Sequence, residues 1–269
     1  MRGRCTVASE HVNGFIIDLD GTVYTGQQDI PGAINGLRKL QQYNIPFLFL
    51  SNRGNYSRAM CKDKLAVMGI EVDAEQIVLS STVTARYLRD HYPQDAIWTL
   101  GDAGLAEELR SHQLVIADKP EQAKWLVITL HESLTYEDLN MAFRAVRAGA
   151  QIIATNEDRM FPTEAGDCID VAGMIGAIVY STGIEVTKVM GKPSTIMADT
   201  ALSILDLPAA QCMVVGDSIA SDVMLGMLHG MSTALVLTGS TTLEDVQQSE
   251  IKPDIVVDSL AELIDQHLS

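Results

Sequence analysis

The sequence predicts an α/β protein whose core is a doubly wound parallel sheet, with a second, smaller α/β domain inserted into it. Two observations indicate this fold class. Short β-rich runs alternate with segments of helical periodicity in the first third of the chain, and the same alternation returns in the last third. The segment between them is long enough to bury a small core of its own. We therefore predict a core of residues 1–82 and 187–269, and an inserted domain of residues 83–186.

The first third is expected to run strand, helix, strand, helix, strand. Pro31 suits the first turn of a helix that continues to about residue 42. Ser57 is a candidate N-cap for the second helix, which is expected to end near Gly69 because glycine readily takes the left-handed conformation after a helix. The strands are predicted at residues 14–18, 45–51 and 77–80.

The last third repeats this order, and the inserted segment adds further α/β units. In the last third, strands are predicted at residues 212–216, 233–238 and 255–257, and helices at about 193–205, 219–229 and 259–267. In the insertion, strands are predicted at residues 96–100, 125–130 and 151–154, and a helix at 135–147, where Thr135 and Asp138 have the spacing of a capping pair.

Composition and charge limit the functions that fit this chain. Of its 269 residues, 47% are hydrophobic, as in an ordinary globular protein. The 19 Lys and Arg residues against 35 Asp and Glu residues give a net charge of −16. Nucleic acid and anionic membrane surfaces would be repelled at long range, so neither is expected as a partner. An anionic substrate would need a local cation in its site.

The cysteines and the apolar runs predict a cytoplasmic protein. Cys5, Cys61, Cys168 and Cys212 lie far apart and form no C-x-x-C pair, so we expect reduced thiols. No secretory signal is visible in residues 1–10, and the apolar runs are shorter than the ~18 residues that a membrane span needs. The oligomeric state stays open, and a homo-oligomer is one alternative.

Polar residues gather where the predicted strands end or a helix begins. Taken singly, each group has a purely structural interpretation as a turn or a helix cap. In an open parallel sheet, however, ligands bind beyond the carboxyl ends of the strands, where these groups fall together. The groups are Asp18-Leu19-Asp20-Gly21-Thr22, Ser51-Asn52-Arg53-Gly54-Asn55, Gly191-Lys192-Pro193-Ser194, and Gly216-Asp217-Ser218 with Asp222.

The chemistry of this set is that of phosphoryl transfer. Carboxylates are the oxygen ligands that Mg²⁺ prefers, and a carboxylate can also form an aspartyl-phosphate intermediate. Backbone N–H groups near Gly21, Asn52 and Gly54, with the Ser51 hydroxyl, can bind phosphate oxygens, while Lys192 offsets the developing charge.

The same residues resemble, in order, the four motifs of the haloacid dehalogenase superfamily of phosphatases. The insertion is similar to the cap of the NagD/nitrophenylphosphatase-like class within it. More narrowly, the chain resembles AraL-type sugar phosphatases. The class-level likeness rests on Ile30-Pro31-Gly32-Ala33, Leu134-Thr135-Tyr136, Ala154-Thr155-Asn156-Glu157-Asp158, Gly191-Lys192-Pro193 and Leu237-Thr238-Gly239, and the narrower one on residues 50–55, 130–132 and 169–176.

The resemblance implies a role for each motif residue. Asp18 would be the nucleophile, and Asp20 the general acid that later activates water. Mg²⁺ would be held by the Asp18 carboxylate, the Asp20 carbonyl and Asp217, with Asp222 and Gly21 in support. Ser51, Asn52, Arg53 and Lys192 would bind the phosphate.

Substrate choice is expected to lie in the inserted cap, since the phosphate site contacts only the transferred group. Polar residues at the ends of two predicted cap strands are the candidates, although each also fits a capping role. They are His131, Glu132, Asn156 and Asp158.

The leading hypothesis is a Mg²⁺-dependent phosphatase of broad specificity for small phosphorylated metabolites, above all sugar phosphates. Nucleoside monophosphates or phosphoglycolate are the alternative substrates. A phospho-acceptor signalling module is a remote alternative, because Asp20 is placed to hydrolyse the aspartyl-phosphate that such a module must preserve. No G-x-G-x-x-G follows the first strand, which argues against a dinucleotide oxidoreductase.

Overall fold

The computed structural model describes residues 12–163 and 166–269. The N-terminal stretch discussed above, with Cys5, lies outside the described residues. The chain divides into two compact units: residues up to Ser51, Lys62–Val78 and Lys192–Ser269 form the first, and Asn52–Cys61 with Leu79–Gly191 form the second. None of the described helices is long and apolar enough to cross a membrane.

The first unit is built on a six-stranded parallel sheet of order β14-β13-β12-β1-β4-β5. Its central strands are fully buried runs of apolar residues, as expected of a parallel sheet covered on both faces. The strands are β1 (Gly14–Ile17), β4 (Phe47–Ser51), β5 (Ile77–Leu79), β12 (Cys212–Gly216), β13 (Ser232–Val236) and β14 (Ile255–Val257).

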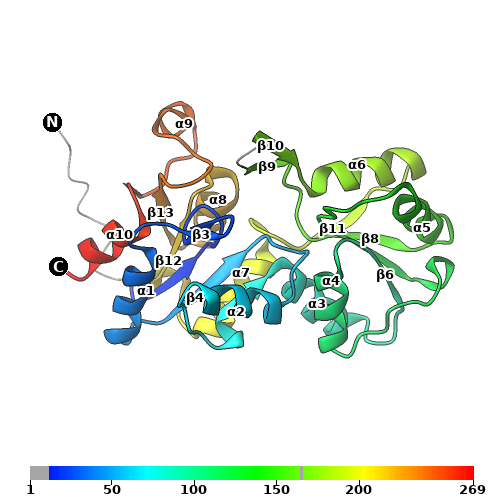
Figure 1. The fold of residues 1–269 in the computed structure, drawn as a ribbon, viewed down its shortest axis with the longest axis horizontal. Coiled ribbons are helices and arrows are strands. Elements are labelled where there is room, and N and C mark those ends of the chain that lie inside the picture. Colours follow the sequence, from blue (N-terminus) through cyan, green and yellow to red (C-terminus); the bar gives the residue numbers. More distant parts are fainter. Residues whose placement is uncertain (1–11, 164–165) are drawn as a thin grey trace. The chain divides into compact units, whose positions relative to one another are not determined.

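Helices cover both faces of this sheet because the chain winds in two directions from its centre. The crossover from β1 to β4 through α1 (Ala33–Gln42) runs one way, and that from β12 to β13 through α8 (Met224–His229) runs the other. Right-handed crossovers in opposite directions put their helices on opposite faces. In Figure 1, α1 lies beside α10 (Leu260–His267), and α8 packs against α7 (Thr195–Leu205).

The remaining elements of the first unit are short. A small antiparallel pair, β2 (Tyr24–Thr25) and β3 (Gln28–Asp29), follows β1. The π-helical turn η4 (Ile219–Val223) leads into α8, and α9 (Leu243–Gln248) joins β13 to β14. Single 3-10 turns lie at Ala74–Gln76 (η1) and Ala209–Gln211 (η3). Helix α2 (Arg58–Val67) begins in the second unit and ends in the first.

The second unit has its own four-stranded parallel sheet, of order β11-β8-β7-β6. The strands are β6 (Ile97–Leu100), β7 (Trp125–Ile128), β8 (Gln151–Ala154) and β11 (Val186–Val189), and an antiparallel pair is formed by β9 (Met160–Thr163) and β10 (Gly166–Ile169). The helices are α3 (Ser80–His91), α4 (Ala103–Ser111), α5 (Tyr136–Arg147) and α6 (Val171–Thr182), with a 3-10 turn, η2, at Pro120–Gln122. Leu126, Ile128 and Ile152 lie at the centre of its core.

The predicted strands lie within two residues of their predicted ends. The Ser57 hydroxyl accepts the Met60 N–H at 3.2 Å, and Gly69 has a φ of +79°, so both helix boundaries were correctly interpreted. Thr135 and Asp138 form the predicted capping box. The first helix, however, begins at Ala33 rather than Pro31, because Gly32 takes the left-handed conformation at a φ of +84° and ends the preceding turn.

Candidate active site

Three carboxylates meet at the carboxyl ends of two neighbouring strands in the first unit. Asp18 follows β1 and Asp217 follows β12, and these strands pair in parallel with Ile17 opposite Val215. Asp222 lies on η4, the turn that continues from β12. One carboxylate oxygen from each of the three side chains lies within 4.8 Å of the others. The structure thus brings together residues that the strand-end pattern predicted to meet.

The Lys192 ammonium group binds two of these carboxylates. Its Nζ lies 2.5 Å from Asp18 Oδ1 and 2.6 Å from Asp222 Oδ1, and it also donates to the Leu50 carbonyl at 3.0 Å. These three contacts use all three N–H donors of the ammonium. Lys192 is buried, and so are both carboxylates. A buried lysine with two carboxylate partners is fixed in position and stays charged.

The electrostatics of the cluster are those of excess negative charge in a buried place. Burial raises the pKa of Asp18 well above its usual value, and Asp222 and Asp217 raise it further, while Lys192 opposes the shift. Burial and Asp222 likewise raise the pKa of Asp217. Burial alone would lower the pKa of Lys192, yet Asp18 and Asp222 together hold it above its ordinary value. The carboxylates are therefore short of positive charge even with the lysine in place.

The loop after β13 contacts both Asp217 and the turn after β1. The Ser240 N–H donates to Asp217 Oδ2 at 2.5 Å, and the Thr238 hydroxyl donates to the Gly21 carbonyl at 2.6 Å. A Cβ atom at Gly239 would lie 2.1 Å from Asp217 Oδ2, and one at Gly21 would lie 2.6 Å from it. Only glycine fits at either position, because a side chain would displace the carboxylate.

Asp20 follows Asp18 by two residues, and Ser51 comes from the strand next to β1. Ser51 is the buried last residue of β4, which pairs with β1. Asp20 is in the turn after β1, where it forms a backbone bridge with Tyr24, and the Gly21 N–H donates to the Tyr24 carbonyl at 2.8 Å. The β2–β3 pair thereby fixes the turn that carries Asp20.

Asn52 and Arg53 belong to the second unit, together with the rest of residues 52–61. Both fall within residues 1–82, the range predicted for the core. Asn52 is hydrogen-bonded to Asn156 and Asp158, two of the cap candidates. The Arg53 guanidinium lies over the Tyr56 ring, 5.2 Å from its centroid.

The other two cap candidates lie elsewhere in the second unit. His131 Nδ1 is 3.1 Å from Asp102 Oδ1, and its Nε2 is 3.6 Å from Asp138 Oδ2. The Glu132 N–H donates to Asp102 Oδ2 at 3.3 Å, and its side chain is exposed. Asp102 also accepts a hydrogen bond from the Asn55 amide at 3.1 Å. His131 is thus placed between two acidic groups of its own unit.

Several residues that build the site were not found from the sequence. The Leu50 carbonyl, the Ser240 N–H and the Thr238 hydroxyl all contact motif residues. Two of these contacts use main-chain atoms, which carry no sequence signal. Leu237-Thr238-Gly239, which follows β13, is among the segments that resemble the phosphatase class, but the sequence assigns Thr238 no role in the site.

The three carboxylates fit a hard divalent cation. Mg²⁺ takes oxygen ligands and keeps several waters, so one or two carboxylates and a carbonyl are enough to hold it. The raised pKa values of Asp18 and Asp217 indicate a place where an added positive charge would be favourable. The donor set and its charge thus both suit the ion that the motifs imply.

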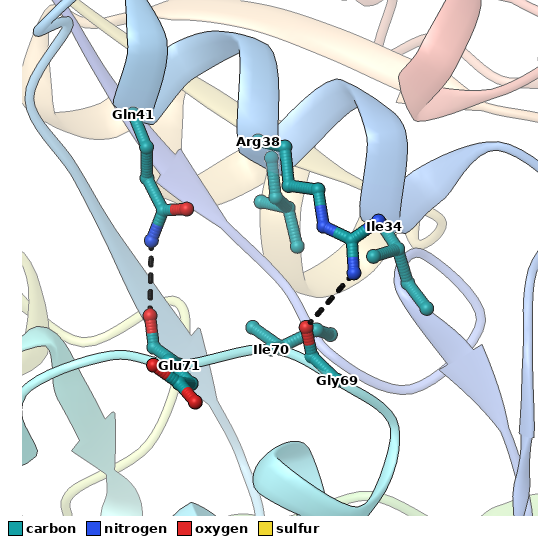
Figure 2. Close-up of a pocket in the computed structure, with 7 residues that line it drawn as sticks. Ile34, Arg38, Gln41, Gly69, Ile70 and Glu71 are labelled. Atoms are coloured by element: carbon teal, nitrogen blue, oxygen red, sulfur yellow. Dashed lines mark hydrogen bonds between the residues drawn. The ribbon is translucent and has the colours of Figure 1, made fainter.

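Two pockets elsewhere in the chain do not contain these residues. The pocket in Figure 2, of about 370 Å³, lies between α1 and the loop after α2, where Arg38 donates to the Gly69 carbonyl and Gln41 to the Glu71 carbonyl. The other, of about 440 Å³, lies along α6 beside Tyr180 and Val186. Neither is lined by a residue of the four motifs.

Comparison with known proteins agrees with the motif arrangement. A haloacid dehalogenase-like hydrolase family model matches residues 15–115, and a HAD-hydrolase-like model matches residues 189–263. The sugar-phosphatase AraL of Bacillus subtilis is 51% identical over 250 residues, which are 93% of this chain and 91% of that protein. The 5'-nucleotidase YutF of the same organism is 32% identical over 93% of this chain and 97% of its own length.

Solved structures lead to the same family. The p-nitrophenyl phosphatase from Archaeoglobus fulgidus superposes with a TM-score of 0.89 at 36% identity, covering 95% of this chain and 99% of that one. The likeness therefore includes both units, and the relatives match in sequence as well as in fold. The chain belongs to the haloacid dehalogenase-like hydrolases.

Proposed function

We propose that this enzyme is a Mg²⁺-dependent phosphatase that hydrolyses small phosphorylated metabolites, chiefly sugar phosphates, through an aspartyl-phosphate on Asp18. One observation carries the proposal. Lys192 binds both Asp18 and Asp222 inside a buried cluster of three carboxylates at the strand ends. Such a cluster has the groups for covalent phosphoryl transfer and for charge neutralisation.

In the first step, an Asp18 carboxylate oxygen attacks the phosphorus and the ester P–O bond breaks. Asp20 donates its proton to the leaving alkoxide, so the alcohol departs neutral. Lys192 fixes Asp18 in place through its hydrogen bond at 2.5 Å and offsets negative charge that gathers on the phosphoryl oxygens. The Ser51 hydroxyl, with the N–H groups that follow it in the chain, would bind those oxygens.

In the second step, water attacks the phosphorus of the aspartyl-phosphate. Asp20, now ionised, accepts the proton from this water, and the bond between Asp18 and phosphorus breaks to release inorganic phosphate. Asp20 thus acts as acid and then as base, and both side chains return to their starting states.

Mg²⁺ would be held by the Asp18 carboxylate, the Asp20 carbonyl and Asp217. When bound, it neutralises charge on the phosphate oxygens and keeps Asp18 ionised. Asp222 supports the site by a different route, because its Oδ1 accepts from Lys192 and its Oδ2 accepts the Ser218 N–H at 3.1 Å.

Sugar phosphates are the proposed substrates because AraL, the relative with 51% identity, is named a sugar phosphatase. Nucleoside monophosphates are the second candidate, since YutF is named a 5'-nucleotidase and is also similar along most of the chain. We assign the choice between them to the inserted domain, predicted at residues 83–186. The cytoplasmic location predicted from the cysteines stays a prediction.

The test is release of inorganic phosphate from a panel of pentose and hexose phosphates, nucleoside monophosphates, phosphoglycolate and p-nitrophenyl phosphate, with and without Mg²⁺. We expect Mg²⁺-dependent turnover that is fastest on sugar phosphates and disappears in Asp18→Asn. Preference for nucleotides would support the second candidate. Full activity in Asp18→Asn, or no turnover of any ester by the wild-type enzyme, would refute the assignment.

A further inference from the structure

A closed ring of hydrogen bonds joins Asn52 to two residues that lie about a hundred positions later. The Asn52 side-chain amide donates to Asp158 Oδ2 at 3.0 Å. The Asp158 N–H donates to Asn156 Oδ1 at 2.9 Å, and the Asn156 amide donates to the Asn52 carbonyl at 2.8 Å. All three residues belong to the second unit, so the ring is formed within one compact body.

The ring fixes the peptide group that links Asn52 to Arg53. Its carbonyl accepts a second hydrogen bond, from the Ser80 hydroxyl at 2.7 Å. In a trans peptide the C=O and N–H bonds point in opposite directions, so a carbonyl held by two donors also fixes the direction of the Arg53 N–H. Both Asn52 and Arg53 are in the segment that we assign to phosphate binding.

The ring also packs against the residue before Lys192. A Cβ atom at Gly191 would lie 2.6 Å from Asn52 Oδ1, 3.0 Å from Asn156 Cβ and 2.5 Å from the Thr155 carbonyl. The backbone at Gly191 therefore approaches the ring as closely as only glycine allows. Gly191, which directly precedes Lys192 in the chain, thus packs on the ring within the second unit.

The Asn156 side chain is buried and hydrogen-bonded within the ring. Its amide nitrogen and its amide oxygen are both used inside the ring, and the residue is only 3% exposed. This arrangement contrasts with the sequence expectation, in which Asn156 and Asp158 selected the organic part of the substrate.

We propose that Asn156 and Asp158 are positioning residues that fix the Asn52–Arg53 peptide for phosphate binding and do not distinguish one phosphate ester from another. The inference rests on the proposed function, because it concerns the affinity of the same phosphate site. It predicts that damage to the ring weakens every phosphate ester equally.

The test compares Asn156→Asp with the wild-type enzyme. This isosteric change keeps the acceptor for the Asp158 N–H but replaces the donor to the Asn52 carbonyl by an oxygen. We expect kcat/KM to fall about tenfold or more, the loss of one buried hydrogen bond, by the same factor for a hexose phosphate, a nucleoside monophosphate and p-nitrophenyl phosphate. The inhibition constant of orthovanadate, which has no organic part, should rise by that factor.

Asn140→Asp is the matched control, because it makes the same chemical change on α5 of the same unit, outside the ring. It should leave all three kcat/KM values unchanged. Asp158→Asn keeps an oxygen that can accept from the Asn52 amide, so this variant should retain most of the wild-type kcat/KM. If Asn156→Asp fails to fold by circular dichroism, Asn156→Ala, which also removes the donor to the Asn52 carbonyl but adds no charge, replaces it with the same readouts.

The outcomes separate this inference from the proposed function. Wild-type turnover of p-nitrophenyl phosphate must be present for the comparison, and its absence refutes the phosphatase assignment itself. With an active wild type, a change in the ratios among the three substrates would show that the pair selects substrates, and the inference would be wrong. Unchanged kinetic constants and unchanged orthovanadate inhibition would also overturn it.

Discussion

At the scale of single residues, the site depends on one buried cation among three carboxylates. Lys192 is held by Asp18 and Asp222, and all its donors are occupied. Removing one partner of a buried ion pair costs far more than the pair contributes, because the remaining charges are left unpaired in a poorly solvated place. Lys192 is therefore expected to matter for stability as well as for turnover.

Lys192→Met removes the charge and keeps a side chain of similar length. We expect loss of phosphatase turnover and a decrease of about 3–5 kcal/mol in the free energy of unfolding at neutral pH, measured by urea denaturation. Lys39→Met is the control, since Lys39 pairs with Asp265 on an exposed surface, where such pairs contribute about 1 kcal/mol at most. Wild-type turnover in Lys192→Met would contradict the role given to this lysine.

At the scale of elements, the start of α2 is held by a buried carboxylate from another helix. Glu108 on α4 is only 2% exposed. Its Oε2 accepts the Arg58 N–H at 2.9 Å, and its Oε1 accepts from Arg58 Nε at 2.8 Å and from the Thr82 hydroxyl at 3.0 Å. Negative charge at a helix N-terminus satisfies N–H groups that have no partner within the helix. Glu108 therefore connects α2, α3 and α4.

Glu108 makes stability depend on pH in a defined direction. Burial alone would raise its pKa, but hydrogen bonds from His112 and Arg58 outweigh this and lower the pKa from 4.5 to about 2. Because the folded pKa lies below the unfolded one, the stabilisation is complete above about pH 5 and is lost as the pH falls from 4.5 towards 2.

The corresponding experiment compares wild type with Glu108→Gln in urea between pH 3 and pH 7. The difference in free energy of unfolding should be largest above pH 5 and should shrink towards acid pH, by about 3 kcal/mol over the full range between the two pKa values. A difference that is constant with pH would show that Glu108 is not preferentially ionised in the folded protein.

The sequence predicted the six strands of the first sheet, three of the four strands of the second sheet, and the carboxylate cluster, because all follow from local patterns. Apolar runs mark β1, β4 and β12, and the polar residues directly after them fall at one edge of the sheet. Helices α3, α4, α6 and α9 were not predicted. Helix α6 is apolar around most of its surface, so its sequence shows no helical periodicity. In the sequence, Glu108 on α4 resembles an ordinary surface carboxylate.

What the sequence could not predict depends on contacts between distant segments. Residues 52–61 follow a core strand but group with the second unit, because Asn52, Asn55 and Arg58 bond to partners in it. Asn156 has a polar side chain near the end of a strand, as a substrate-binding residue often does. Both of its polar side-chain atoms are nevertheless hydrogen-bonded inside the protein. Only the folded structure distinguishes these roles.

At the scale of the whole molecule, the net charge of −16 means that binding of an anionic substrate depends on positive charge within the site. An anionic ester is repelled by the protein as a whole. The cluster itself contains three carboxylates against one lysine, so Lys192 does not balance it. A divalent cation would bring the site near neutrality and permit a phosphate to bind.

Mg²⁺ is therefore expected to bind without substrate and to stabilise the folded protein. At a hundred times its dissociation constant it should add about 2.7 kcal/mol to the free energy of unfolding, which is measurable as an upward shift in melting temperature over the EDTA-treated protein. Asp217→Asn should reduce this shift. Equal melting temperatures with Mg²⁺ and with EDTA would contradict the predicted site.

The most direct test of the central claim is detection of a phosphoryl group on Asp18. Asp20→Asn should slow hydrolysis of the intermediate, whereas p-nitrophenolate, a good leaving group, departs without a proton from Asp20. Acid quenching of this variant during turnover of p-nitrophenyl phosphate, followed by peptide mass spectrometry, should find the peptide with residue 18 heavier by one phosphoryl group. Turnover with no phosphoryl group on that peptide, or with one on a different residue, would contradict the account.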